Sequence, residues 1–271
     1  MKYVISIVVL SVLLSKQLVY GQSDVFYVPQ TNNSWSNISN ALNTQNAWVL
    51  YSNPAALVYT SPLSIGVACK QMYGLTDLIN STLCVGGLYS FGAVGSTVTM
   101  FSNNYIQSYL ISFHYAKQIF TKASVSVSGI YSCSQSEEFN SNCNSIIPQI
   151  SATYKPYSEL LLGFTIVQPI YYRLKQTKYF EEFECAASYS GIPNVVVTIA
   201  TKKSYNDFLI TTVGIDYTVH TSLVFSASVA NQYRPLSLGI GYRISRCIFQ
   251  YATSVHSFLG FSHTVSFLYS L

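Results

Sequence analysis

Charged residues are scarce in this chain. Of its 271 residues only 9% are Asp, Glu, Lys or Arg, whereas 49% are hydrophobic and 15% are aromatic. A water-soluble domain carries about a quarter charged residues, so the sequence does not encode an ordinary soluble surface. Low charge combined with high hydrophobicity also excludes a long disordered protein. The formal net charge of +4 is too weak and too scattered to indicate a nucleic-acid partner.

Long hydrophobic runs are lacking as well. Beyond the first fifteen residues there is no uncharged apolar stretch of about 18 residues or more, so a bundle of transmembrane helices is not predicted. A chain that is hydrophobic on average, but nowhere continuously so, is typical of strands that alternate between lipid and a polar interior.

Motifs of catalysis and metal binding are also missing. The chain has no Cys-x-x-Cys pair, no Gly-x-Ser-x-Gly elbow and no glycine-rich phosphate loop, and its 4 histidines are dispersed. We therefore predict no catalytic residue, no cofactor, no metal site and no enzymatic activity. Cys133 and Cys143 flank a polar stretch; in an oxidising compartment they could form a disulfide, and two free thiols remain the equal alternative.

The N-terminus predicts export. A basic start at Met1-Lys2-Tyr3 precedes the apolar run 4–14, and Val19-Tyr20-Gly21 supplies a cleavage site, which together are typical of a signal peptide over residues 1–21. Residues 22–60 show no sustained period, and Asn, Ser and Thr dominate 30–46. We expect an irregular or partly helical plug or cap there, followed by a barrel over residues 61–271.

From residue 63 onward, apolar and small polar residues alternate in repeated segments. In residues 122–131, for example, apolar side chains alternate with serines: Ala123, Val125 and Val127 with Ser124, Ser126 and Ser128. Because successive side chains of a strand point to opposite faces, each segment has one apolar and one polar face. The pattern predicts about 14 strands, at 63–72, 81–91, 94–101, 106–116, 121–132, 146–155, 159–168, 179–190, 194–202, 207–218, 221–230, 234–244, 246–254 and 260–271.

The connections are tight after every second segment, whereas several of the others are longer, notably 133–145 and 169–178. This asymmetry is typical of an outer-membrane barrel whose longer loops lie outside the cell. The 23 tyrosines, many near the ends of the expected strands, fit the two membrane–water boundaries. A soluble secreted β-sandwich is the structural alternative, but its outer faces would carry Lys and Glu rather than Ser, Thr, Gly and Ala. We therefore expect an all-β fold: a closed antiparallel transmembrane barrel in the bacterial outer membrane.

Two short runs resemble a known family. Residues 52–57 (SNPAAL) resemble the Asn-Pro-Ala-Gly/Ala-Leu element before the first strand of FadL-like and PorV/PorQ-like outer-membrane proteins, and residues 259–267 (LGFSHTVSF) resemble the closing strand of PorV/PorQ-like chains. The resemblance implies a 14-stranded barrel with an N-terminal plug. FadL-type members move long-chain hydrophobic molecules, whereas PorV/PorQ-type members serve type IX secretion.

The expected function is thus non-enzymatic: transport of hydrophobic compounds, or service as a type IX secretion component, with a structural or adhesive surface barrel as the alternative. Expected partners are outer-membrane lipid and either a hydrophobic small molecule or secretion-system proteins. Transport predicts an apolar pocket near Trp48, Leu50 and Leu57, whereas assembly predicts a partner at loop 133–145. Candidate plug and lumen residues are Trp48, Leu50, Asn53, Pro54, Leu57, His114, Glu182, Glu184, Asp216 and Arg243.

Overall fold

The structure is a computed structural model that describes residues 46–103, 106–136, 141–167, 182–204, 209–220, 222–231 and 236–271. The predicted signal peptide, 1–21, and the first part of the predicted plug, 22–45, lie outside these residues, as does the whole of the expected loop 169–178. Among the described residues, no helix has the length and apolar character needed to cross a bilayer.

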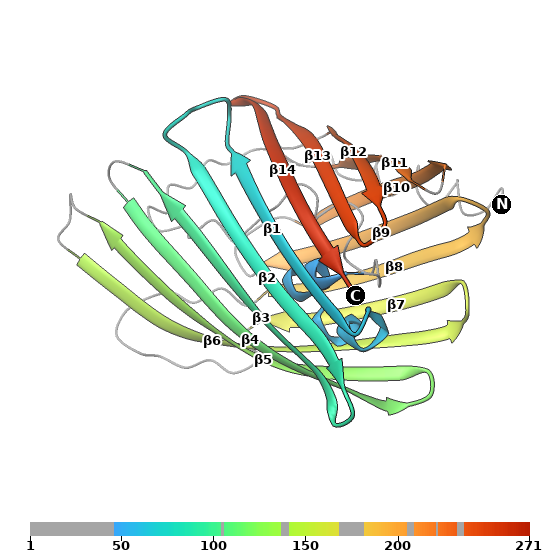
Figure 1. Cartoon of the computed structure of the whole chain (residues 1–271). Helices are drawn as coiled ribbons and strands as arrows, with labels where there is room; N and C mark the ends of the chain where they lie inside the picture. The colour runs from blue at the N-terminus through green and yellow to red at the C-terminus, as the bar shows by residue number, and fades with distance from the viewer. Residues whose placement is uncertain are drawn as a thin grey trace. The chain divides into compact units, whose positions relative to one another are not determined.

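Fourteen antiparallel strands form one closed sheet, in which each strand pairs with its sequence neighbours and β1 pairs with β14 (Figure 1). This confirms the predicted barrel, and all fourteen expected segments are present. The strands are β1 (Leu63–Gln71), β2 (Ile79–Tyr89), β3 (Gly92–Ser102), β4 (Ile106–Phe120), β5 (Ala123–Ser136), β6 (Ser141–Tyr157), β7 (Leu160–Val167), β8 (Glu182–Ile192), β9 (Val195–Ser204), β10 (Ile210–His220), β11 (Leu223–Ala230), β12 (Leu236–Ile244), β13 (Cys247–His256) and β14 (Gly260–Ser270).

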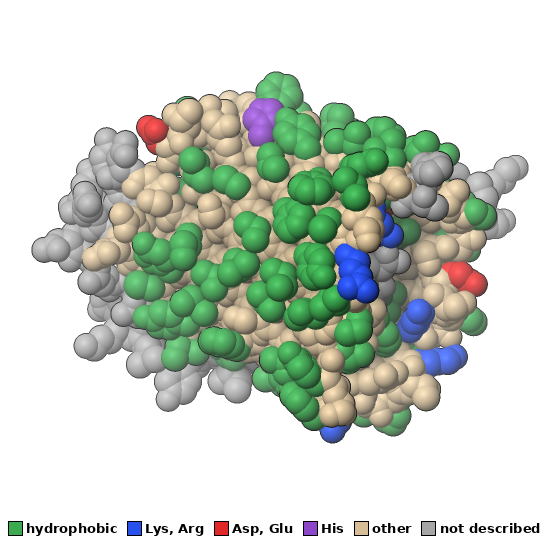
Figure 2. All heavy atoms as spheres, in the orientation of Figure 1, with side chains coloured by type: hydrophobic (Ala, Val, Ile, Leu, Met, Phe, Trp, Pro, Cys, Tyr) green, Lys and Arg blue, Asp and Glu red, His purple; other side chains and the backbone are tan. Residues whose placement is uncertain are grey.

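The two faces of the sheet differ as the alternation predicts. On β5, Ser124, Ser126 and Ser128 are buried, whereas the intervening Val127 is 59% exposed. The same pattern recurs around the barrel: large apolar side chains lie over the outer surface, as Figure 2 shows for one face. The buried inward positions are mostly small polar residues. A closed sheet pairs its backbone groups internally, and this arrangement leaves the apolar side chains to contact lipid.

The strand ends divide into two rims. The turns after the even-numbered strands are tight, such as Pro193-Asn194 and Ser245-Arg246, and both chain-terminal strands β1 and β14 have their outer ends at this tight-turn rim. Asn194 and Ser245 adopt positive φ angles of 61° and 54°, which lets two residues reverse the chain. The other rim carries the longer connections.

One expected loop is much shorter than predicted. Strand β5 continues to Ser136 and β6 begins at Ser141, so most of the expected loop 133–145 is a β-ladder. The polar composition that suggested a loop is also compatible with strands, because a barrel interior accepts Ser, Asn and Gln.

A ring of tyrosines marks the tight-turn rim. Every even-numbered strand from β2 to β12 carries an exposed tyrosine near the end that leads into the tight turn: Tyr89, Tyr115, Tyr154, Tyr189, Tyr217 and Tyr242. Tyrosine has an apolar ring and a polar tip, so it is favoured at the membrane–water boundary. The tyrosine ring therefore indicates where the hydrocarbon ends on this side of the barrel.

Candidate functional site

Residues 46–60, named here the inner segment, lie inside the barrel as two short 3₁₀ helices, η1 (Ala47–Tyr51) and η2 (Pro54–Tyr59). An asparagine begins each helix: the Asn46 side chain accepts a hydrogen bond from the Trp48 N–H, and the Asn53 side chain accepts one from the Ala55 N–H, each at 3.1 Å. Pro54 occupies the first position of η2, where its missing N–H costs nothing. The SNPAAL run is thus a helix start inside the barrel.

The Asn53 amide also bonds the inner segment to the wall. Its Nδ2 donates to the carbonyl oxygens of Ala152 on β6 at 3.1 Å and of Phe164 on β7 at 3.4 Å. One side chain therefore starts η2 with its oxygen and attaches η2 to two strands with its nitrogen.

Three apolar side chains of the inner segment fit against glycines of the wall. Trp48, Leu50 and Leu57 are at most 2% exposed. A Cβ atom added to Gly66, Gly86 or Gly95 would lie 2.9 Å from Trp48 Cζ2, 2.8 Å from Leu57 Cδ1 or 2.5 Å from Leu50 Cδ2, respectively. Since such distances are too short for a real side chain, the glycines provide the space that the inner segment occupies.

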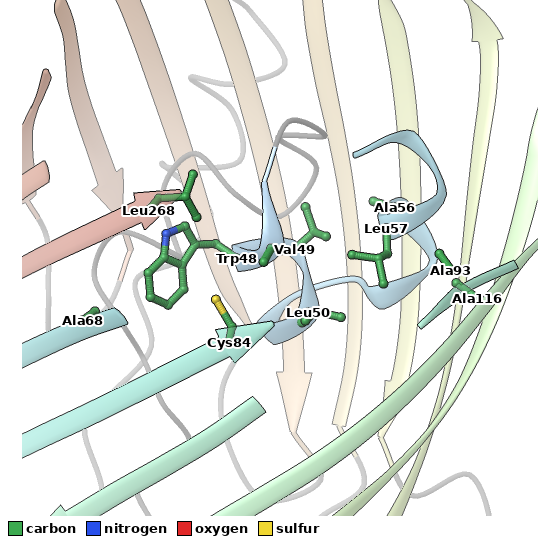
Figure 3. Packing of buried hydrophobic residues seen from close by; sticks show 11 residues of the cluster. Trp48, Val49, Leu50, Ala56, Leu57, Ala68, Cys84, Ala93, Ala116 and Leu268 are labelled. Atoms are coloured by element: carbon green, nitrogen blue, oxygen red, sulfur yellow. The ribbon is translucent and has the colours of Figure 1, made fainter. Parts of the chain in front are cut away.

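Figure 3 shows the resulting apolar cluster. The Trp48 indole lies between Cys84 of β2 and Leu268 of β14, while Leu57 lies near Ala93 of β3. Trp48, Leu50 and Leu57 are therefore packed against the wall. Because they are buried, these three side chains do not line an open cavity, and an apolar pocket beside the inner segment stays a prediction.

Tyr51 attaches η1 to β2 and β3. Its hydroxyl lies 3.2 Å from the Leu83 carbonyl oxygen and 3.2 Å from Thr99 Oγ1. Burial raises the pKa of the Tyr51 hydroxyl above its ordinary value, which keeps the group protonated and able to donate.

Further hydrogen bonds attach the start and the middle of the inner segment to the barrel wall. The Ala47 N–H donates to Ser64 Oγ of β1 at 3.0 Å. Ser124 Oγ of β5 donates to the Ala55 carbonyl at 2.7 Å, and Thr165 Oγ1 of β7 donates to the Ser52 carbonyl at 3.2 Å. The hydrogen bonds described here connect the inner segment to β1, β2, β3, β5, β6 and β7, so we call β1–β7 the occupied half of the barrel.

The inner face of strands β10–β13 is more accessible. Inward positions there are at least partly exposed at Thr212, Val224, Gly239, Arg243 and Gln250. Most of these side chains are small or uncharged. We call β8–β13 the open half, and its inner face is the candidate path for a solute. Strand β14 is not part of it, because its Leu268 packs against Trp48 of the inner segment.

The predicted charged lumen residues lie on the inner face, but they are not gathered into one site. Glu182 on β8 is buried and forms an ion pair with Lys202 of β9, with 2.5 Å between Glu182 Oε1 and Lys202 Nζ. Glu184 is half-buried one inward position below Glu182. Asp216 on β10 is buried, whereas Arg243 on β12, close to the tight-turn rim, is exposed.

His114 lies in the occupied half, within a chain of hydroxyl groups. Its Nε2 is 2.6 Å from Ser112 Oγ and its Nδ1 is 2.8 Å from Ser128 Oγ, and Ser112 also bonds Thr97. The two serines and the histidine are buried. These bonds join the side chains of β3, β4 and β5, which gives His114 a role in holding the wall together.

The sequence left open whether Cys133 and Cys143 form a disulfide or stay free thiols. Cys133 carries a free thiol, and the β5–β6 ladder aligns it with Asn144, while Cys143 aligns with Ser134. Neighbouring positions of a strand face opposite sides of the sheet, so this register separates the two cysteines. The Cys143 side chain lies outside the described residues. Within those residues no group of three or more His, Cys, Asp or Glu could hold a metal ion.

Sequence reasoning missed the three glycines, Tyr51 and the buried Lys70 of β1. A signal for the glycines exists: Gly66, Gly86 and Gly95 occupy inward positions on three consecutive strands, where other strands carry Ser or Thr. The reason for glycine at these positions is clear only from the structure, in which Trp48, Leu50 and Leu57 pack against them.

The fold is shared with solved outer-membrane barrels. The structure is similar to the CymD monoaromatic hydrocarbon channel, with a TM-score of 0.63 and 12% identity over 86% of this chain and 97% of that one. For the Pseudomonas putida toluene transporter TodX the TM-score is 0.58 at 11% identity, covering 86% and 97% of the two chains. For the Acinetobacter baumannii outer membrane protein Omp33 it is 0.51 at 11% identity, covering 78% and 98%.

No protein-family model and no curated protein matches the sequence. At these identities the neighbours show the fold. The barrel closure, the apolar exterior and the shared fold identify an integral protein of the bacterial outer membrane.

Proposed function

We propose that this protein is a narrow channel that lets small uncharged molecules, including hydrophobic ones, cross the outer membrane. The observation that carries the proposal is the difference between the two halves of the lumen. The inner segment fills space beside β1–β7, whereas several inward positions of β10–β13, among them Thr212, Val224 and Gln250, remain partly exposed. A solute path along the open half follows from this arrangement.

The lining of that path favours uncharged solutes. Thr212, Val224 and Gly239 offer hydroxyl, methyl and backbone surfaces without charge. Charged residues on the inner face of the open half are few, and Asp216 is buried. Arg243 lies toward the tight-turn rim, and the Glu182–Lys202 pair lies toward the other rim. Pores for ions or charged sugars use rings of like charge, and the open half carries none among its described residues.

The solved structures with a similar fold suggest monoaromatic hydrocarbons as the first substrate class to test. Two of them carry titles that name a monoaromatic hydrocarbon channel and a toluene transporter. The same class agrees with the FadL side of the sequence resemblance. No feature of the described residues favours the type IX secretion role, and the expected partner loop at 133–145 is mostly strand.

The test is uptake of radiolabelled toluene by cells whose outer membrane contains the protein, compared with cells lacking it. Gly241→Leu places a bulky side chain in the open half, where a Cβ would meet Gln250 Cγ at an ordinary 3.5 Å. Gly129→Leu is the matched control, because Gly129 faces outward and its Cβ would meet nothing within 4 Å. We expect G241L to reduce uptake several-fold and G129L to leave it unchanged.

Equal uptake with and without the protein would overturn the proposal and would favour a structural or adhesive barrel. Planar-bilayer recording adds a second test. A barrel narrowed by the inner segment should give small conductance, so large and steady channels from the intact protein would contradict a narrow path.

A further inference from the structure

The outer wall contains a groove that the transport proposal does not use. It crosses strands β5–β9 with a volume of about 620 Å³. Its lining follows two neighbouring rungs of the sheet, one through Ala123, Tyr154 and Ala187, the other through Ala152, Phe164 and Cys185. These side chains occupy outward positions, so the groove faces the membrane.

The groove exists because small outward residues meet across adjacent strands. Ala123, Ala152, Cys185 and Ala187 form a low floor, whereas most outward positions elsewhere carry large apolar side chains. Tyr154 belongs to the tyrosine ring and lines the groove, so one end of the groove reaches the membrane–water boundary.

Two lysines flank that end. Lys117 is exposed on β4, two residues beyond Tyr115 of the tyrosine ring, and pairs in register with Val125, which lines the groove. Lys122 immediately precedes Ala123, and its Nζ donates to the Pro156 carbonyl at 2.9 Å while remaining exposed. Both ammonium groups therefore lie at the depth of lipid headgroups, beside the apolar groove.

Other charges near this rim leave it positive. Lys155 directs its ammonium to the Tyr59 ring of the inner segment, 5.9 Å from the ring centroid. The one acidic group described in the neighbouring β6–β7 turn is Glu159, whose Oε1 accepts from Ser158 Oγ at 3.0 Å. The groove thus combines apolar walls with a net positive end.

We propose that the groove binds one anionic phospholipid of the periplasmic leaflet. An acyl chain lies across β5–β9, and the phosphate lies against Lys117 and Lys122. Short turns of such barrels face the periplasm, which puts the lysines at that leaflet. A cationic residue at the membrane surface attracts anionic lipid by about 1 kcal/mol, or about fivefold in affinity. A second copy fits less well, since a two-fold contact at this rim would bring the same lysines together. The inference is independent of the solute path.

The experiment measures lipid retained by the purified, folded protein. Protein in detergent is incubated with phosphatidylglycerol or with phosphatidylethanolamine of the same acyl chains, and bound lipid is counted by native mass spectrometry. The charge variant is the Lys117→Gln and Lys122→Gln double mutant, with Arg246→Gln as control because Arg246 lies at the same rim beside β13. The groove variant is Ala152→Leu, with the exposed, outward-facing Ala227→Leu on β11 as control.

We expect one bound phosphatidylglycerol, held more tightly than phosphatidylethanolamine. Each lysine removed should weaken the preference about fivefold, and A152L should weaken both lipids, while R246Q and A227L should change neither. Equal binding of the two lipids, or an equal loss in R246Q, would overturn the proposal. The proposal would also be overturned if the protein had the mass of a dimer and A152L had the mass of a monomer. A second copy of the chain would then occupy the groove. Folding of each variant is checked by its heat-dependent migration on gels.

Discussion

The two halves of the barrel both have an apolar outer face, but their inner faces differ. In β1–β7 the wall is built around the inner segment, with glycines opposite Trp48, Leu50 and Leu57. In β8–β13 the inward positions carry hydroxyls, glycines and a few charges, and several of them are partly exposed. One alternating pattern thus encodes the same membrane contact around the whole barrel, while the choice of small residue decides what each half holds inside.

The largest expected effect tests whether the outer faces are equivalent. Ile150 on β6 and Ile240 on β12 are both exposed outward, at 43% and 40%. Replacing either with Arg should lower the free energy of unfolding by about 2–4 kcal/mol if the site is near the bilayer midplane. Urea titration of the protein folded in vesicles measures the loss. A large effect in only one half would break the equivalence.

The next effect separates the inner faces. Gly95→Leu forces a side chain into the position of Leu50, so we expect a loss of about 1–3 kcal/mol from overpacking, together with larger conductance as η1 is displaced. Gly241→Leu, in the open half, should cost little stability and reduce conductance. If both variants behaved alike in planar bilayers, the inner segment would not distinguish the two halves.

Asn53→Ala should have a smaller effect. The substitution removes the start of η2 and the bonds to the Ala152 and Phe164 carbonyls, so we expect a loss of about 1–2 kcal/mol in the free energy of unfolding. Asn231→Ala is the control in the open half. Its side chain makes two backbone hydrogen bonds of 3.0 Å but is exposed to water, so its loss should be smaller. The same titration measures both variants, and an equal loss would argue against tight attachment of the inner segment.

Tyr51→Phe should have the smallest effect. Removing the buried hydroxyl leaves the Leu83 carbonyl and Thr99 with one bond fewer, at a cost of about 1 kcal/mol. Tyr242→Phe, on the outer face of the open half, should change the stability less because its hydroxyl lies at the water boundary. An unchanged midpoint for Tyr51→Phe would show that these bonds contribute nothing net.

The sequence predicted the wall well, because a period of two is sufficient to assign each side chain to a face. The inward placement of Glu182, Glu184 and Asp216 followed from that period alone, and so did the outward placement of the tyrosines. Strand ends were less accurate where Ser and Asn continue the ladder, as in β5 and β6. Composition does not distinguish a polar loop from a polar strand wall.

The contents of the lumen and the outer groove could not be predicted in the same way. Gly95 must be small because Leu50 packs against it. Ala152 contributes to the outer groove only because Ala123 and Cys185 lie on nearby strands. The choice between a Cys133–Cys143 disulfide and free thiols stayed open for a related reason, since spacing along the chain says nothing about register. These features depend on neighbours across the sheet.

The bond from Thr165 to the Ser52 carbonyl has a consequence for assembly. It joins residues 113 positions apart, and the inner segment precedes every strand in the chain. Its attachment can be complete only after seven strands have formed, because the last partners are on β7. A segment that precedes the barrel strands in the chain is therefore among the last to be fixed, and it docks onto a sheet that is only half formed.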